Sequence, residues 1–372
     1  MTIVGTRPEL IKMSRVISEF DLFTDHILVH TGQNYDYELN QLFFEELQIR
    51  KPNYFLETGL NNNAAQIIAE VIAKSDEVMT KEKPDAIMLY GDTNSCLAVI
   101  SAKRQKIPVF HMEAGNRCFD QRVPEELNRK VVDHLSDINF VLTEHARRYL
   151  VREGINPEMI IKTGSHMAEV LDYYEPQIRD SKVLEVLGYK SKNYFLVSAH
   201  REENVDDVTG INNLLSTLNE IAVRYNLPVV VSTHPRTKKR LEGMDLDSLN
   251  PHIKFLKPFG FFDYIKLQQE ALCIVSDSGT ITEEASLLNL SAVTIRNTHE
   301  RPEGMDAGTL IMCGLEKNRV LNAIDITIKN KESKNTNLVI TDYAYGLNAS
   351  KKILKNTISY IDYINKAVWK KV

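Results

Sequence analysis

Short apolar runs alternate with longer amphipathic stretches along the whole chain. The longer stretches carry apolar residues at helical spacing, as Leu10, Met13 and Ile17 do within residues 8–20. The short runs are mostly apolar, without strict alternation, which is typical of strands buried on both faces of a parallel sheet. In the first half they span residues 2–4, 26–30, 86–90, 109–112 and 139–142. In the second half they span residues 194–198, 229–232, 253–256, 273–276 and 292–295.

This repetition predicts an α/β fold of two doubly wound, Rossmann-like domains. The chain has 372 residues, which is long for a single hydrophobic core. Polar residues interrupt the pattern near residues 165–185, so we expect an N-terminal domain over residues 1–168 and a C-terminal domain over residues 169–349. The last helical stretch, residues 350–372, is expected to pack back on the first domain.

Composition narrows the functional classes. Hydrophobic residues make up 43% and charged residues 26% of the chain, as in ordinary globular proteins. The net charge of -5 argues against nucleic acid as a partner, and no apolar run is long enough to cross a bilayer. The four cysteines are far apart and form no CxxC pair, which favours free thiols in a reducing cytoplasm. Neither an HExxH motif nor a tight His/Asp cluster indicates a metal site.

Polar residues follow six of the apolar runs directly. Ligands of doubly wound sheets bind beyond the carboxyl ends of the strands, so these segments are the candidate site. They are Gly5–Glu9 (GTRPE), Gly91–Thr93 (GDT), Glu113–Gly115 (EAG), His200–Asn204 (HREEN), His234–Arg236 (HPR) and Asp277–Thr280 (DSGT).

The Asp277–Thr280 turn has two interpretations. Ser278, Gly279 and Thr280 could present backbone N–H groups to a phosphate at a helix start. Alternatively, Thr280 and Glu283 form an ordinary capping box. The GTRPE segment and the helix after it also have two interpretations. Arg7 and Lys12 could bind phosphate, but a lysine is often simply solvated. GxGxxG and GxxxxGK[ST] motifs are both lacking, so we expect neither a nicotinamide cofactor nor a P-loop.

Three carboxylates are candidates for acid–base chemistry. Asp92 and Glu113 each follow an apolar run, and Glu125 begins a predicted helix on which Asn128 and Arg129 share its face. Clustered acids can divide into proton donor and acceptor. The alternative is structural, with acids in a first helical turn and a Glu125–Arg129 pair at the surface.

Histidines and aromatic residues complete the candidates. His200 follows a strand among charged neighbours, which favours a site residue, whereas His111 and His234 are expected to be structural. An aromatic cluster surrounds Gly260 and could stack a nucleobase, pack in the core or form a lid. Its members are Phe255, Phe259, Phe261, Phe262 and Tyr264.

Taken together, the segments GTRPELIKM, GDTNS, HMEAG, VPEELNR, HREEN, SDSGTITEE and HERPEG resemble the non-hydrolysing UDP-N-acetylglucosamine 2-epimerase family. The resemblance implies two Rossmann-like domains facing a cleft, as in GT-B glycosyltransferases, and a homodimer. It also implies inversion of C2 by elimination of UDP, through a 2-acetamidoglucal, and re-addition of UDP on the other face. The products of such enzymes are precursors of surface polysaccharides.

Family roles carry over to the matching residues. Arg7 and Lys12 would lie near the nucleotide sugar, with Asp92, Glu113 and Glu125 around the sugar itself and Asn128 and Arg129 in the same motif. His200 would contact the diphosphate or assist its departure, and Arg301 would complete the anionic pocket. Ser278, Gly279 and Thr280 would hold phosphate. Glu284 would bind the ribose hydroxyls, and the segment with Phe259 and Tyr264 would bind the uracil.

Some residues depart from the commonest family pattern. Thr280 stands where a second glycine is usual, and residues 32–37 replace a stretch that often contacts an allosteric UDP-GlcNAc. Together with HREEN and STHPRT, these features are similar to the subgroup that makes UDP-N-acetyl-L-fucosamine from a 6-deoxy talose epimer. Other classes remain open: a GT-B glycosyltransferase and a nucleotide-sugar sensor without catalysis.

Overall fold

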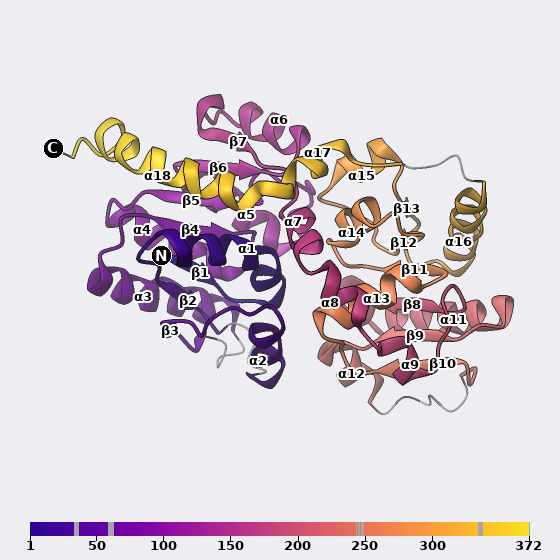
Figure 1. Ribbon diagram of the computed structural model, residues 1–372. Coiled ribbons are helices and arrows are strands. Elements are labelled where there is room, and N and C mark those ends of the chain that lie inside the picture. The colour runs from indigo at the N-terminus through magenta and orange to yellow at the C-terminus, as the bar shows by residue number, and fades with distance from the viewer. Residues whose placement is uncertain are drawn as a thin grey trace. The chain divides into compact units, whose positions relative to one another are not determined.

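The computed structural model describes residues 1–32, 37–58, 63–242, 244, 246, 249–333 and 338–371. The chain forms two compact units, one of Met1–Tyr173 with Thr341–Val372 and one of Tyr174–Ile340. Each unit contains one fully parallel sheet with helices on its faces, so the predicted α/β class with two Rossmann-like domains is confirmed (Figure 1).

The sheet of the first unit has seven strands in the order β3-β2-β1-β4-β5-β6-β7. These strands are short and buried almost throughout, because Val, Ile and Phe side chains on both faces pack under helices. They are β1 (Thr2–Val4), β2 (Leu28–His30), β3 (Tyr54–Phe55), β4 (Ile87–Tyr90), β5 (Val109–Met112), β6 (Ile138–Val141) and β7 (Ile160–Lys162).

The longer helices of the first unit, such as α1 and α3, bury an apolar stripe against this sheet or against a neighbouring helix. They are α1 (Arg7–Phe23), α2 (Tyr37–Glu46), α3 (Ala64–Glu82), η2 (Asn94–Ala98), α4 (Val99–Arg104), α5 (Pro124–Leu135), α6 (Glu144–Arg152), η3 (Pro157–Met159), α7 (His166–Tyr173), α17 (Thr341–Ala344), η4 (Tyr345–Asn348) and α18 (Ala349–Ala367). Among the described residues, no helix is both long and apolar enough to cross a membrane.

The second unit repeats the plan with six strands in the order β10-β9-β8-β11-β12-β13. They are β8 (Phe195–Ser198), β9 (Val229–Ser232), β10 (Ile253–Leu256), β11 (Cys273–Ser276), β12 (Ala292–Thr294) and β13 (Ile311–Met312). The helices are α8 (Glu175–Asp180), α9 (Val183–Leu187), α10 (Glu202–Val205), α11 (Val208–Tyr225), α12 (Pro235–Leu241), α13 (Phe261–Glu270), α14 (Ile281–Leu287), α15 (Pro302–Ala307) and α16 (Lys317–Glu332).

Strand order fixes where polar loops can meet. In the first sheet β1 lies between β2 and β4, and in the second β8 lies between β9 and β11. From these strands the crossover connections run in opposite directions across the sheet. Loops that follow neighbouring strands therefore meet at one edge. The segments that start at Gly5 and Gly91 meet in the first unit, and those that start at Ala199 and Asp277 meet in the second.

The C-terminal segment belongs to the first unit. Helix α18 packs against α1 and α7, and Ser350 donates through its backbone N–H to the carboxylate of Glu169 at 2.8 Å. Asp342 bonds Lys162 Nζ at 2.7 Å and accepts the N–H of Glu144 at 2.7 Å. The chain thus re-enters the first unit at Thr341. The helical pattern placed the start of this returning segment at residue 350, nine residues later.

Gly346 is a point of very close approach. A Cβ on this residue would lie 1.8 Å from the carbonyl oxygen of Ser165, so alanine at this position requires the backbone to move. We expect Gly346→Ala to lower the free energy of unfolding of the first unit by about 2–3 kcal/mol. The single tryptophan, Trp369, lies in this unit, so its fluorescence in a urea titration measures the effect.

Gly154 provides the comparison for this substitution. It has φ +91° and open space around its Cβ position, so Gly154→Ala introduces backbone strain without a clash. This variant should cost about 1 kcal/mol. Equal effects of the two substitutions would contradict the close packing of Gly346 on Ser165.

Candidate active site

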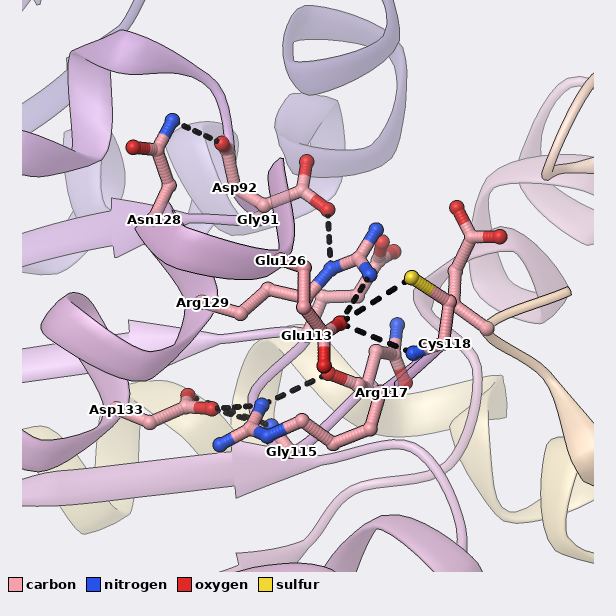
Figure 2. A network of polar contacts seen from close by, with 12 residues as sticks. Gly91, Asp92, Glu113, Gly115, Arg117, Cys118, Glu126, Asn128, Arg129 and Asp133 are labelled. Carbon is pink, nitrogen blue, oxygen red and sulfur yellow. Dashed lines mark hydrogen bonds and ion pairs between the residues drawn. The ribbon is translucent and has the colours of Figure 1, made fainter. Parts of the chain in front are cut away.

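The first group of polar side chains lies at the carboxyl edge of the first sheet, and Figure 2 shows its network. Asp92 follows β4, Glu113 follows β5, and α5 contributes Asn128 and Arg129. Side-chain exposure separates the acids that a ligand can reach from those that hold the loops. Asp92 is 24% exposed and Glu113 is 11% exposed, whereas Glu126 is 0% exposed.

Glu113 has an unusual backbone and two strong donors. Its φ is +62°, in the left-handed region that a residue with a Cβ seldom occupies, and such residues cluster at functional sites. Lys12 Nζ lies 2.6 Å from its Oε2, and the hydroxyl of Tyr90 donates to the same atom. Lys12 is buried and paired, so the interpretation of Lys12 as a solvated lysine is wrong. Arg7, on the same helix, places its guanidinium 5.5 Å from the ring centre of Phe43.

Arg129 connects α5 to the loop after β4. Its Nε lies 2.7 Å from Asp92 Oδ2 and its Nη1 lies 3.1 Å from Glu126 Oε2. Asn128 Nδ2 donates to the carbonyl oxygen of Asp92 at 2.9 Å. The alternative of a Glu125–Arg129 surface pair is therefore wrong, because Arg129 is buried and the neighbouring Glu126 is its helix partner. Glu125 is half-buried in the first turn of α5 and takes no part in these ion pairs.

Glu126 anchors the loop that follows Glu113. Its carboxylate accepts the backbone N–H groups of Cys118 at 3.0 Å and Phe119 at 3.2 Å, in addition to Arg129. Glu126 was not among the predicted site residues. The pair of adjacent acids after Pro124, Glu125 and Glu126, indicated that one of them could face the site. Which of the two faces inward depends on how the helix is rotated against the sheet.

A second anchor of the same loop is the buried carboxylate of Asp133. It accepts His111 Nδ1 at 2.8 Å, Arg117 Nη1 at 2.7 Å and the N–H of Gly115 at 3.2 Å. Burial alone would raise the pKa of Asp133, but the hydrogen bond and charge of His111 and the charge of Arg117 outweigh it and lower that pKa. His111 also bonds the carbonyl oxygen of Gly91 at 2.8 Å, so both of its ring nitrogens hold the sheet edge together.

Glu9 holds the loops after β1 and β4 together. Its carboxylate accepts the N–H of Gly5 at 2.6 Å, the hydroxyl of Thr6 at 3.0 Å and the hydroxyl of Thr93 at 2.7 Å. Burial, with a smaller contribution from the charge of Asp92, raises the pKa of Glu9 to about 7 despite these donors.

This raised pKa gives a pH dependence with a definite sign. Between about pH 4.5 and 7 the unfolded chain releases the Glu9 proton while the folded chain retains it, so the free energy of unfolding falls as pH rises. Glu9→Gln should reduce the fall in unfolding free energy between pH 5 and 8 by about 2–3 kcal/mol. Urea titrations of Trp369 fluorescence at both pH values measure it. The exposed Glu158→Gln variant should keep the wild-type fall, and an unchanged fall in Glu9→Gln would refute the assignment.

The second group of polar side chains lies in the second unit, around Asp277. Asp277 accepts His200 Nδ1 at 3.0 Å and Asn204 Nδ2 at 3.0 Å, and it also accepts the N–H groups of His200 and Arg201, each at 2.9 Å. Burial would raise the pKa of Asp277, but the charge and hydrogen bond of His200 lower it to about 2. Asp277 therefore fixes the loop after β8 against the loop after β11 and aims the half-exposed ring of His200.

The turn after Asp277 is not a capping box. Thr280 makes no side-chain capping bond to α14, and its hydroxyl lies 3.0 Å from that of Ser278. Glu283 pairs with Arg301 Nη2 at 2.9 Å instead of reaching back to Thr280. The capping alternative is therefore wrong, and the hydroxyls of the turn are arranged by contacts within the turn.

Guanidinium groups surround this turn. A Cβ on Gly279 would lie 3.8 Å from Arg201 Nη2 and 3.8 Å from Arg296 Nη1, which is ordinary contact distance. Glu300 pairs with Arg296 and lies 3.7 Å from Arg201. Arg296 and Glu300 were not predicted, although the apolar run 292–295 precedes them, because the sequence does not show that β12 lies beside β11. Guanidinium groups in this position can pair with the oxygens of a diphosphate, although Glu300 neutralises part of their charge.

The aromatic cluster divides into core and boundary residues. Phe261 is buried and, with Phe262, packs on Tyr174, so these two serve packing. Phe259 and Tyr264 are half-buried at the edge of the core. Burial, and then the charge of Glu284, raises the pKa of Tyr264, whose hydroxyl bonds Ser198 and Gln268.

Glu284 accepts Gln268 Nε2 at 2.6 Å, which places it beside Tyr264. Within the described residues, no three His, Cys, Asp or Glu side chains are grouped so that they could hold a metal ion.

Comparison with known proteins decides the family. The family model described as UDP-N-acetylglucosamine 2-epimerase matches residues 20–357. A UDP-N-acetylglucosamine 2-epimerase of Methanococcus maripaludis is 35% identical over 96% of this chain and 97% of its own length. The chain belongs to the UDP-N-acetylglucosamine 2-epimerase family. It is therefore an enzyme of the epimerase class.

Solved structures of 2-epimerases have the same fold. The UDP-N-acetylglucosamine 2-epimerase of Rickettsia bellii is 59% identical, with a TM-score of 0.93 over 100% of this chain and 99% of that one. The Methanocaldococcus jannaschii UDP-GlcNAc 2-epimerase in complex with UDP-GlcNAc and UDP is 32% identical, with a TM-score of 0.88 over 96% of this chain and 99% of that one.

The side chains predicted for this 2-epimerase fall into two sets. The set in the first unit contains Arg7, Lys12, Asp92, Glu113, Glu125, Asn128 and Arg129. The set in the second unit contains His200, Phe259, Tyr264, Ser278, Gly279, Thr280, Glu284 and Arg301. The first set combines three carboxylates with Arg7, Lys12 and Arg129, whereas the second combines small turn residues and aromatic residues with His200 and Arg301.

Proposed function

We propose that this enzyme inverts C2 of a UDP-N-acetylhexosamine, converting UDP-GlcNAc to UDP-ManNAc without net release of UDP. One observation carries the proposal: two accessible carboxylates, Asp92 and Glu113, are fixed beside buried cations at the carboxyl edge of the first sheet. The solved relative in complex with UDP-GlcNAc and UDP supports this choice of substrate.

The reaction needs both acid–base groups and a site for a departing anion. The proton on C2 is weakly acidic, so its removal must be coupled to departure of the diphosphate from C1. A carboxylate takes the proton, the C1–O bond breaks with its electron pair leaving on UDP, and a C1=C2 double bond forms in a 2-acetamidoglucal. UDP then adds back at C1 while C2 receives a proton on its opposite face, so no atom is gained or lost overall.

We assign the proton transfers to Glu113 and Asp92, because an ionised carboxylate held by donors can act as a base and return the proton as an acid, and to Glu125 as the third acid of the same motif set. Arg129 and Lys12 keep the acids oriented, and Arg7 and Asn128 complete the sugar end. At the other end, Ser278, Gly279, Thr280, His200 and Arg301 would stabilise the negative charge that develops on UDP. Glu284 would bind the ribose, and Phe259 and Tyr264 would contact the uracil.

Incubation with UDP-GlcNAc in D2O, followed by proton NMR, tests the proposal. We expect the C2 proton to exchange for deuterium and UDP-ManNAc to accumulate while free UDP stays low. Stoichiometric free ManNAc and UDP would show hydrolysis and overturn the proposal. An absence of exchange would also overturn it for this substrate.

A 6-deoxy sugar is the second candidate substrate. The observation that favours it is Thr280, which stands where a second glycine is usual in the family and places its hydroxyl 3.0 Å from that of Ser278. The same NMR experiment with UDP-2-acetamido-2,6-dideoxy-talose separates the two. Exchange that is faster with the talose compound than with UDP-GlcNAc would assign the enzyme to the synthesis of UDP-N-acetyl-L-fucosamine.

A further inference from the structure

Tyr90 is a buried tyrosine that contacts the proposed base directly. It is the last residue of β4, and its hydroxyl donates to Oε2 of Glu113. The ring is held edge-on against His166, with ring centres 5.8 Å apart. Lys12 Nζ lies 5.7 Å from the centre of the same ring and 2.6 Å from the same carboxylate oxygen. The phenol, the ammonium group and the carboxylate therefore form one packed cluster.

The two donors act on Glu113 in different ways. Lys12 contributes a full positive charge, which favours the ionised carboxylate over a wide range of orientations. The hydroxyl of Tyr90 is neutral and directional, and it stands on a ring that neighbours hold on two sides. Its hydrogen bond therefore selects one rotation of the carboxylate about its last torsion, and it favours the ionised form as well.

We infer that Tyr90 is a positioning residue for the epimerisation, holding Glu113 oriented and ionised between successive proton transfers. The inference rests on the proposed function, because it assumes that Glu113 exchanges a proton with C2. When Glu113 takes up that proton, the bond from Tyr90 to a neutral acid is weaker than the bond to a carboxylate. Tyr90 thereby favours return of the proton and keeps the base ready for the next turnover.

Tyr90→Phe removes one oxygen atom and leaves the ring against His166 and Lys12. Without this donor the ionised carboxylate is less stable, so it forms only at higher pH. We expect the acidic limb of the kcat/KM profile to move up by about one pH unit, so that kcat/KM at a fixed pH on that limb falls roughly tenfold. The Kd for UDP should stay unchanged, because the diphosphate-binding residues lie in the other unit.

Tyr54→Phe is a matched control. The hydroxyl of Tyr54 also donates to a carboxylate, Glu82, and a lysine, Lys81, lies 2.8 Å from that hydroxyl. This second cluster lies between β3 and α3 of the same unit. Loss of its hydroxyl should leave the pH profile and kcat as in the wild type, which separates a specific role of Tyr90 from a general effect of losing a tyrosine hydroxyl that donates to a carboxylate.

A measurement independent of turnover separates this inference from the proposed function. In protein labelled with ¹³C at the glutamate side-chain carboxyl carbon, the Glu113 resonance is assigned by its absence in Glu113→Gln. Its titration midpoint should be higher in Tyr90→Phe than in the wild type. If the wild type shows no C2 exchange, the proposed function fails while this titration still reports on Tyr90. An unchanged midpoint, or an unchanged acidic limb in an active enzyme, overturns the inference.

Discussion

Replacing Glu113 by glutamine is expected to abolish deuterium exchange at C2 of the nucleotide sugar. Glutamine keeps the shape of the side chain and can still accept from Lys12 and Tyr90, but it cannot take up a proton. Loss of a general base typically costs about 10²–10⁴-fold, and here the same group is proposed to serve in both directions, so kcat should fall by about 10³-fold or more. Proton NMR in D2O measures the exchange.

UDP binding should persist in the Glu113→Gln variant, because the cations and the turn that would hold the diphosphate lie in the second unit. Calorimetric titration with UDP tests this. Glu82→Gln is the matched control, since Glu82 also accepts from a tyrosine hydroxyl in the same unit. Retained turnover in Glu113→Gln, or an equal loss in Glu82→Gln, would overturn the acid–base assignment.

Arg117→Met is expected to cause the largest loss of stability among these substitutions. The guanidinium is completely buried, with Nη1 2.7 Å from Asp133 and Nη2 2.6 Å from Glu153. Removing it takes the guanidinium partner from the buried carboxylate of Asp133, which keeps its bond to His111, and breaking such a buried pair typically costs about 3–5 kcal/mol. Urea unfolding followed by Trp369 fluorescence measures the change.

Arg122→Met serves as the comparison for Arg117. Arg122 pairs with Asp120 at 2.7 Å, but its side chain is 88% exposed, and exposed pairs contribute at most about 1 kcal/mol. If both substitutions cost the same, the buried network does not stabilise the fold as its geometry implies. The loss in Arg117→Met should also lower activity, since Asp133 holds the loop on which Glu113 lies.

Much of the architecture could be predicted because the relevant signals are local. Strands such as β5 and β11 are mostly apolar and fully buried, and parallel strands deliver the residues that follow them to one edge of a sheet. Asp92 and Glu113 could be selected for that reason. Their position depends only on where a strand ends, and the sequence shows that directly.

Other parts of the site depend on packing that no local pattern records. Tyr90 looks like one more apolar residue of a strand, and only the position of Lys12, 78 residues earlier, makes its hydroxyl part of a cluster. Glu125 and Glu126 are adjacent acids, and the rotation of α5 decided which one is buried. Thr280 and Glu283 have the spacing of a capping box, but Glu283 forms an ion pair with Arg301.

The return of residues 341–372 to the first unit has a consequence for synthesis on the ribosome. The second unit is one continuous segment, Tyr174–Ile340, so all of its contacts are available before the chain is finished. The first unit requires contacts such as Lys162 with Asp342 and Glu169 with Ser350, which join residues 180 and 181 positions apart. Although its sheet is made first, the first unit is therefore completed last, after the C-terminal helix has been released.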